Sequence, residues 1–250
     1  MNILLSGATG RMGHIVAGYV AGQAKHKIIA GYAAEEEAGL GFPVYLDLAD
    51  CKETEAVDLI IDFSAASSLN KLLAFALANK LPIVVASTGF SDDQEEEIRR
   101  AAQEIPVLHA KNMSLGINVM EGLVKEMASK LTGFDIEIIE KHHRGKKDSP
   151  SGTAKMLFEA ANLGRSGSLK ALNGRAGDYA SRPTNEVGIS AIRGGTIVGE
   201  HSVIFAGQDE ILEIKHTANS RLIFASGAVR AAEFLLEQPA GFYDMSDVLA

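Results

Sequence analysis

The segment from residue 140 to residue 154, EKHHRGKKDSPSGTA, carries the side chains best suited to chemistry on an anion. Its basic or titratable members stand close together, and they are His142, His143, Arg144, Lys146 and Lys147. A lysine donates a proton effectively when neighbouring positive charge lowers its pKa. We therefore expect Lys146 to be the general acid of the site.

The end of this segment predicts an anion site. Ser151, Gly152 and Thr153 stand at the start of a periodic apolar stretch that predicts a helix from Thr153 to about Ala161. Unpaired N–H groups and hydroxyls at the start of a helix bind carboxylates and phosphates. The same residues would also serve as a plain helix cap without a ligand. Both interpretations fit the sequence.

Two adjacent histidines end the predicted strand that precedes this loop. Neighbouring strand residues point to opposite faces of a sheet, so His142 and His143 are poorly placed to bind one metal ion. We expect no metal, and we expect one of the two histidines to face the substrate.

A second motif lies near the start of the chain. Gly7, Gly10 and Gly13 follow the first predicted strand and precede a predicted helix. Glycines in this position let the chain turn tightly and let backbone N–H groups approach a pyrophosphate at the helix N-terminus. Arg11 and Met12 lie inside the turn, where Arg11 is placed to pair with a phosphate. A glycine-rich turn without a ligand is the alternative, but further strand–helix units behind it favour a dinucleotide site.

Ligands of such sheets bind at the carboxyl ends of the strands. Glu35 is the first acid after the second strand, where it either accepts from a ribose or is a solvated carboxylate. Lys and Arg are missing there, so the sequence leaves NADH and NADPH open. The expected cofactor contacts are Gly7, Ala8, Thr9, Gly10, Arg11, Met12, Gly13, Glu35, Phe63, Ser87, Thr88, Gly89, Ala110, Asn112 and Met113.

The alternation of strands and helices up to residue 113 predicts an α/β fold, a Rossmann-type doubly wound parallel sheet. We expect residues 1–113 with 218–250 to form a dinucleotide-binding domain. Residues 114–217 would then form a second domain of α+β type with a mostly antiparallel sheet. Its late strands, near 188–195, 199–207 and 211–218, resemble a meander, and 164–185 reads as a loose polar stretch.

Composition narrows the class of protein. The net charge of −8 argues against general affinity for nucleic acid. Cys51 is the single cysteine, which suits a reducing compartment. No apolar run reaches the length of a membrane span, and the first residues do not read as a signal peptide. We expect a cytoplasmic protein without a membrane partner.

The run HHRGKKDSPSGTA resembles the characteristic motif of the dihydrodipicolinate reductases, also called 4-hydroxy-tetrahydrodipicolinate reductases, of lysine biosynthesis. Further blocks resemble the same family in the same order along the chain: GATGRMG, DFS, STGF, AKNMSLGIN, IRGGTIVGEH and FASGAVRAA. The resemblance implies a Rossmann domain, a second domain that binds substrate and builds a homotetramer, and hydride transfer from NADH or NADPH to C4 of a cyclic imine-type dicarboxylate with loss of water.

Carried over by residue, the resemblance makes Lys146 the general acid and His142 the first motif histidine. His143 and Lys146 would approach one substrate carboxylate, while Gly152 and Thr153 would bind the other. The chain departs from many relatives at Gly145, where they carry a larger side chain, and in a short stretch between residues 164 and 183.

Two other functions remain compatible with the motifs: a dinucleotide-sensing regulatory protein without chemistry, and a dehydrogenase for another small acid. The block from Arg193 to His201 reads as a glycine-rich hairpin, or as a segment through which Arg193 orients the catalytic loop. Residues 112–114 and the segment near Ala218 would act as hinges between the domains.

Overall fold

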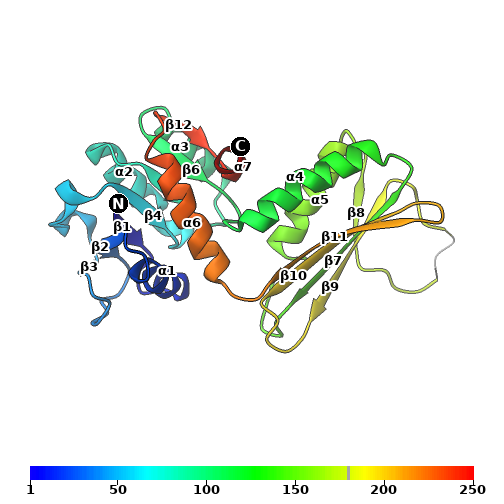
Figure 1. The fold of residues 1–250 in the computed structure, drawn as a ribbon, viewed down its shortest axis with the longest axis horizontal. Helices are drawn as coiled ribbons and strands as arrows, with labels where there is room; N and C mark the ends of the chain where they lie inside the picture. Colours follow the sequence, from blue (N-terminus) through cyan, green and yellow to red (C-terminus); the bar gives the residue numbers. More distant parts are fainter. Residues whose placement is uncertain (179–180) are drawn as a thin grey trace. The chain divides into compact units, whose positions relative to one another are not determined.

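The computed structural model describes residues 1–178 and 181–250. The chain divides into two compact units, one of Met1–Leu115 with Arg221–Ala250 and one of Gly116–Ser220 (Figure 1). Each unit has buried clusters of its own. Among the described residues, no helix is both long and apolar enough to cross a membrane.

The first unit is built on a parallel sheet of seven strands in the order β12-β6-β5-β4-β1-β2-β3. The strands are β1 (Asn2–Ser6), β2 (Lys27–Tyr32), β3 (Val44–Tyr45), β4 (Leu59–Asp62), β5 (Ile83–Val85), β6 (Pro106–His109) and β12 (Gly241–Tyr243). The chain runs outward from β1 in both directions, which is the doubly wound order that the sequence predicted. The strand order reverses between β1 and β4, and ligands of doubly wound sheets bind at the carboxyl ends of the strands beside such a reversal.

Helices cover both faces of this sheet. They are α1 (Arg11–Ala21), α2 (Leu69–Asn79), α3 (Asp92–Ala101), α6 (Leu222–Leu235) and α7 (Met245–Leu249), with short 3₁₀ turns at Leu48–Asp50, Thr54–Ala56 and Ala66–Ser68. The buried residues of α1, α6 and α7 pack on one face and those of α2 and α3 on the other. Since both faces are covered, the central strands are apolar throughout, as in Ile3–Leu5 and Leu59–Ile61.

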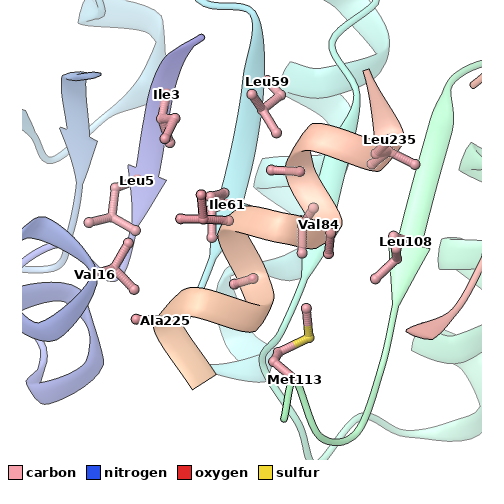
Figure 2. Packing of buried hydrophobic residues seen from close by; sticks show 14 of the residues in the cluster. Ile3, Leu5, Val16, Leu59, Ile61, Val84, Leu108, Met113, Ala225 and Leu235 are labelled. Carbon is pink, nitrogen blue, oxygen red and sulfur yellow. The ribbon is translucent and has the colours of Figure 1, made fainter. Parts of the chain in front are cut away.

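The helix α6 returns from the far end of the chain to complete the first unit. It lies across the strands, with Ala225 and Leu235 at the buried cluster around Ile61 and Val84 (Figure 2). A Cβ added at Gly227 would stand 1.8 Å from the carbonyl oxygen of Met113. Only glycine therefore permits this close approach of the helix to the backbone.

The second unit packs two helices on one face of a five-stranded sheet. Its elements are α4 (Leu115–Lys130), β7 (Asp135–His142), α5 (Gly152–Gly164), β8 (Lys170–Asn173), β9 (Glu186–Arg193), β10 (Gly199–Ala206) and β11 (Ile211–Ala218). Alternate residues of β7 are buried, from Ile136 to His142. Ile136 and Ile138 belong to a cluster with residues of α4 and α5, so this inner face is the one covered by the helices.

The strand order β11-β10-β7-β9-β8 corrects one expectation. β10 pairs antiparallel with β7 and with β11, whereas β9 pairs parallel with β7 and with β8. The sheet is thus mixed, and the meander is wrong for β9 and β10 because β7 inserts between them. The stretch 164–185, which we expected to be loose and polar, also contains the strand β8. Residues 179–180 of this stretch lie outside the described part of the chain.

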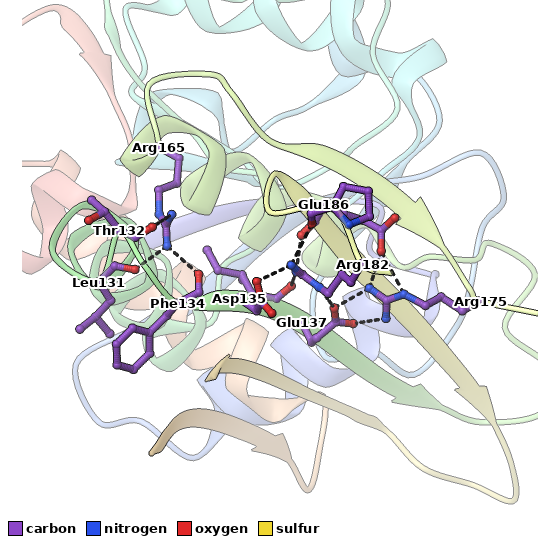
Figure 3. Close-up of polar contacts among 11 residues, drawn as sticks. Leu131, Thr132, Phe134, Asp135, Glu137, Arg165, Arg175, Arg182 and Glu186 are labelled. Atoms are coloured by element: carbon purple, nitrogen blue, oxygen red, sulfur yellow. Dashed lines mark hydrogen bonds and ion pairs between the residues drawn. The ribbon is translucent and has the colours of Figure 1, made fainter. Parts of the chain in front are cut away.

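Arginines fix the outer face and one end of β7 (Figure 3). Arg175 donates to both carboxylate oxygens of Glu137 at 2.6 and 2.7 Å, and Arg182 donates to Glu137 at 3.0 Å and to Asp135 at 2.6 Å. Burial raises the pKa of Glu137, but these hydrogen bonds outweigh it, so the net pKa is lowered. Arg165 donates to backbone carbonyls between α4 and β7, including those of Leu131 and Phe134.

Candidate active site

Glu140 is the centre of a buried polar network at the carboxyl end of β7. Its side chain is fully buried, and each carboxylate oxygen has two hydrogen-bond partners. Oε1 accepts from the backbone N–H of Ser151 at 3.0 Å and from Nη2 of Arg193 at 2.7 Å. Oε2 pairs with Nδ1 of His142 at 2.7 Å and accepts from Nη1 of Arg193 at 2.7 Å. One carboxylate thus connects β7, β9 and the start of α5.

The sheet register brings these residues together. His142 of β7 lies beside Arg193 of the parallel strand β9, and Glu140 lies opposite His201 of the antiparallel strand β10. Glu140 and His142 are two residues apart on one strand, so they share the inner face. A Cβ at Gly199 would lie 3.1 Å from Nε2 of His142, so a small residue at position 199 leaves room for this ring.

The charges of this network are well defined. Burial raises the pKa of Glu140, yet the hydrogen bonds from Arg193, His142 and Ser151 together lower it below its usual value. Burial lowers the pKa of His142 more than its bond to Glu140 raises it. At neutral pH the network therefore contains an ionised carboxylate, an arginine cation and a neutral imidazole.

Ser151 caps α5 and contacts a second histidine. Its Oγ accepts from the N–H of Ala154 at 3.1 Å and lies 3.0 Å from Nε2 of His201. Burial, together with repulsion from His142 when that ring is protonated, lowers the pKa of His201 to about 4. The rings of His142 and His201 meet edge to face, with centroids 5.2 Å apart.

The first turn of α5 follows directly on this cap. Gly152 is exposed, and Thr153 is half-buried. The cap that the sequence offered as an alternative is therefore present, but it leaves the N-terminal backbone of α5 at the surface beside the basic loop. A cap of this kind and an anion site are compatible in one helix N-terminus.

Lys146 lies in the loop between β7 and α5. Its Nζ is 2.8 Å from Oδ1 of Asp148, and this contact lowers the pKa of the Asp148 carboxyl. Arg193 also donates to the backbone carbonyl of Asp148 at 2.7 Å. From the sequence we expected only positively charged neighbours around Lys146, whereas the structure places the carboxylate of Asp148 beside it. Asp148 was missed although it stands two residues further along the same motif.

Other contacts hold the loop to the end of β9. The N–H of Gly194 donates to the carbonyl of His142 at 2.9 Å, and the N–H of Arg144 donates to that of Gly195 at 3.2 Å. His143 is half-buried, and Arg144 is exposed. We considered two interpretations of the segment around Arg193: a plain glycine-rich hairpin, or a segment that orients the catalytic loop. These contacts favour the second interpretation.

Sequence reasoning did not assign a role to Glu140 or His201. A signal for Glu140 was present, since strand periodicity places it on the same face as His142. His201 carried no such signal, because its neighbours follow from the insertion of β7 beside β10 and not from local sequence.

The glycine turn of residues 7–13 lies at the carboxyl end of β1 in the first unit. Gly7 has a φ of +76°, and a Cβ there would lie 2.7 Å from the carbonyl oxygen of Phe63. A Cβ at Gly13 would lie 2.2 Å from the carbonyl oxygen of Gly7. Helix α1 begins at Arg11 behind this turn. Side chains at Gly7 and Gly13 would clash with the protein's own backbone, so glycine is required for this tight turn, which we call the glycine cradle.

The neighbouring strand ends are joined by a buried carboxylate. Asp62, at the end of β4, accepts from the N–H of Ser64 at 2.9 Å and from the hydroxyl of Ser87 beyond β5. Thr88 and Gly89 follow at the surface, and Gly89 has a φ of +85°. Because β1, β4 and β5 are adjacent, the structure brings these segments to one edge of the sheet.

The remaining expected cofactor contacts differ in exposure. Ala8, Ala110 and Met113 are buried, Thr9, Met12, Phe63 and Asn112 are half-buried, and Gly10 and Arg11 are exposed. Glu35 is exposed in the loop after β2, where Glu37 instead contacts Nε2 of His14 at 2.9 Å.

The strand order and the glycine cradle of the first unit define a nucleotide-binding oxidoreductase of Rossmann type, with a second unit that carries a basic loop at a helix N-terminus. The family models for the N-terminal and C-terminal parts of dihydrodipicolinate reductase match residues 1–113 and 116–249. The chain belongs to the dihydrodipicolinate reductase family.

Relatives and a solved structure agree with this placement. The chain is 44% identical to the 4-hydroxy-tetrahydrodipicolinate reductase of Caldanaerobacter subterraneus subsp. tengcongensis, covering 100% of this chain and 98% of the relative. It is 42% identical to that of Clostridium tetani, with 100% and 97% covered. Its fold is similar to a dipicolinate-bound dihydrodipicolinate reductase from Paenisporosarcina sp. TG-14, with a TM-score of 0.81, 21% identity, and 98% and 97% of the two chains covered.

Proposed function

We propose that this chain reduces 4-hydroxy-tetrahydrodipicolinate to tetrahydrodipicolinate with NADH or NADPH, in the diaminopimelate route to lysine. The reaction consumes one hydride and one proton and releases water. The observation that carries the proposal is that both parts of one reductase family match nearly the whole chain. The network around Glu140 supports it, since it holds the motif histidine and the start of α5 in one rigid arrangement.

The first unit is the proposed dinucleotide-binding domain, residues 1–113 with 218–250. Glycine at positions 7 and 13 lets the turn pack tightly against neighbouring backbone, and the turn leads directly into α1. Phosphates fit such a cradle at a helix N-terminus. The strand-end residues Phe63, Ser87 to Gly89, and Ala110 to Met113 would hold the rest of the cofactor. When bound, the cofactor supplies the hydride that goes to C4 of the substrate.

The second unit is the proposed substrate-binding domain, residues 114–217. A dicarboxylate needs two anion sites, and this unit offers two kinds of donor. His143 and Lys146 would pair with one carboxylate, while Gly152 and Thr153 at the start of α5 would bind the other. Ser151, which the sequence placed with them, is buried and instead holds this turn through Glu140 and Ala154. Charge-assisted hydrogen bonds of this kind are stronger than neutral ones.

Lys146 is the proposed proton donor, and His142 is the second proposed catalytic residue. The ammonium group carries the proton that the reduced ring must receive. Asp148 contacts Nζ of Lys146 and would compete with a substrate carboxylate for the same group. The neutral imidazole of His142 lies at the same end of β7, held from behind by Glu140.

We further propose a homotetramer in the cytoplasm. Apolar side chains on the outer face of the second sheet support the assembly: Ile192 is 46% exposed and Ile211 72% exposed. β11 is an edge strand, and exposed apolar surface at such an edge favours association. Light scattering coupled to gel filtration would report four copies if the proposal holds and one copy if it does not.

A coupled assay tests the activity. Substrate is generated from pyruvate and aspartate semialdehyde, and nicotinamide absorbance is followed after addition of the protein. We expect rapid loss of absorbance, with competitive inhibition by pyridine-2,6-dicarboxylate. Cofactor binding without turnover would contradict the proposal and favour a regulatory protein, and turnover with a different small acid alone would favour another dehydrogenase.

A further inference from the structure

Glu140 has a hydrogen-bonding demand that only a carboxylate can meet. Three donors and one ring nitrogen converge on its two oxygens: the N–H of Ser151, two guanidinium nitrogens of Arg193, and Nδ1 of His142. An amide of the same shape has only one acceptor oxygen, so it would satisfy either the Ser151 side or the His142 side. The arrangement therefore requires an ionised glutamate at this position.

Arg193 keeps this carboxylate charged although it is buried. A buried charge is tolerated when it is paired and hydrogen-bonded, and the bidentate contact of Arg193 at 2.7 Å to both oxygens provides this. The same guanidinium reaches the carbonyl of Asp148, whose side chain contacts Lys146. Arg193 thus connects Glu140 with the loop that carries the proposed proton donor.

We propose that Glu140, clamped by Arg193, is a positioning residue that fixes His142 as the Nδ1–H tautomer and seats the first turn of α5 through the same carboxylate. An ionised carboxylate can only accept, so the ring nitrogen that faces it must carry the proton. The Nε2 atom is left as an acceptor. The tautomer follows from the structure alone, whereas its value for catalysis rests on the proposed function.

This assignment separates the roles of two residues. A neutral imidazole with its proton on Nδ1 has no proton to donate from Nε2, so His142 accepts a hydrogen bond there and the proton donor is Lys146. The partner of a catalytic histidine commonly sets its tautomer in this way, and exchange of the carboxylate for an amide leaves the shape intact but orients the wrong tautomer.

The tautomer can be measured without any turnover. The seven histidines are labelled with ¹⁵N in the ring, and the resonances of His142 are assigned by comparison with His142→Gln. We expect the unaltered chain at neutral pH to show a protonated Nδ1 and an unprotonated Nε2 for His142. The opposite tautomer, or an even mixture of the two, would overturn the inference even if no variant of Glu140 folds.

The variant Glu140→Gln tests the consequence for catalysis. Its amide serves only one of the two sides, so we expect a mixed or reversed tautomer at His142 and a fall in kcat of at least about tenfold, as for other residues that orient a catalytic group. Unchanged kcat and an unchanged tautomer would contradict the proposal. If instead the unaltered chain fails to turn over the substrate, the proposed function fails while the tautomer assignment is judged by the spectra alone.

Glu137→Gln is the matched control. Glu137 lies on the same strand, is also paired with arginines, and points to the opposite face. We expect this variant to lose stability through its ion pairs while the His142 tautomer and kcat stay as in the unaltered chain. A change of tautomer in both variants would mean that any loss of charge on β7 has this effect, which would overturn a specific role for Glu140.

Discussion

Lys146 is the residue on which the proposed proton transfer depends. The ammonium group is held near Asp148 in a loop that Arg193 ties to the end of β9. Removal of the lysine side chain should leave the network around Glu140 intact, because the partners of Glu140 in the described part of the chain are Ser151, His142 and Arg193. The effect of a substitution should therefore fall on chemistry and not on folding.

We expect Lys146→Ala to lower kcat by about 10²- to 10⁴-fold, the range for a general acid. Cofactor affinity, measured by fluorescence titration with NADH, should be unchanged because the glycine cradle lies in the other unit. Lys125→Ala, an exposed lysine on α4, is the control and should keep its activity. Full activity of Lys146→Ala would refute the assignment of the proton donor.

His201 gives the stability of the chain a defined pH dependence. The pKa of His201 is about 4 in the folded chain, where the residue is only 4% exposed. In the unfolded chain the imidazole has its ordinary pKa of 6.5. Above pH 6.5 the imidazole is neutral in both states and its contribution is fully present. As the pH falls from 6.5 towards 4, the unfolded chain binds the proton first, and the free energy of unfolding drops by about 3 kcal/mol.

Urea unfolding at pH 7 and pH 4.5 measures this loss. We expect His201→Gln to show a smaller decrease between the two pH values than the unaltered chain. Part of the decrease should persist, because the neighbouring imidazoles of His142 and His216 also have lowered pKa values. Identical decreases in both proteins would show that His201 does not titrate in this window.

At the scale of elements, local pattern predicted much of the fold. Strands and helices alternate up to residue 113 as expected, α5 covers the predicted 153–161, and β9 to β11 lie close to their predicted ranges. The pairing of β9 and β10 could not be predicted this way, because β7 inserts between them from a distant part of the sequence. The same insertion places His201 opposite Glu140. The motif of residues 140–154 could therefore be found from the sequence, whereas its contact with His201 of β10 could not.

The glycine turn allows an element-scale test on one helix. We expect Gly13→Ala to weaken NADH binding at least about tenfold, or about 1.4 kcal/mol, because its Cβ would stand 2.2 Å from the carbonyl oxygen of Gly7 and distort the turn. Dicarboxylate binding in the second unit should be retained. Both affinities can be measured by calorimetry.

Gly18→Ala is the control for this substitution. Gly18 lies on the same helix, and no heavy atom stands within 4 Å of the position of its added Cβ. This change should leave NADH affinity unaltered and stabilise the helix by up to about 1 kcal/mol. Equal NADH affinities for the two variants would show that the turn is not the cofactor cradle.

At the scale of the whole molecule, the chain leaves the first unit at Leu115 and returns to it at Arg221. The second unit is continuous, and its core cluster contains only its own residues, from Met120 to Phe205 with Ile214 packed against it. The first unit depends on α6, whose buried residues cover one face of its sheet (Figure 2).

We therefore expect a fragment of residues 116–220 to fold alone and a fragment of residues 1–115 to fail, because the latter would expose the sheet face that α6 covers. Circular dichroism and the dispersion of amide resonances would show the difference. A well-folded fragment of residues 1–115 would mean that the returning helix is not needed for the core of the first unit.

The central claim is that the two units serve one reaction, with the hydride from a cofactor held by the first and the substrate and proton donor held by the second. The most direct measurement supplies NADH that carries deuterium at both C4 positions of the nicotinamide and analyses the product by mass spectrometry and NMR. We expect one deuterium atom at C4 of tetrahydrodipicolinate. A product without deuterium, or with deuterium at another carbon, would contradict the account.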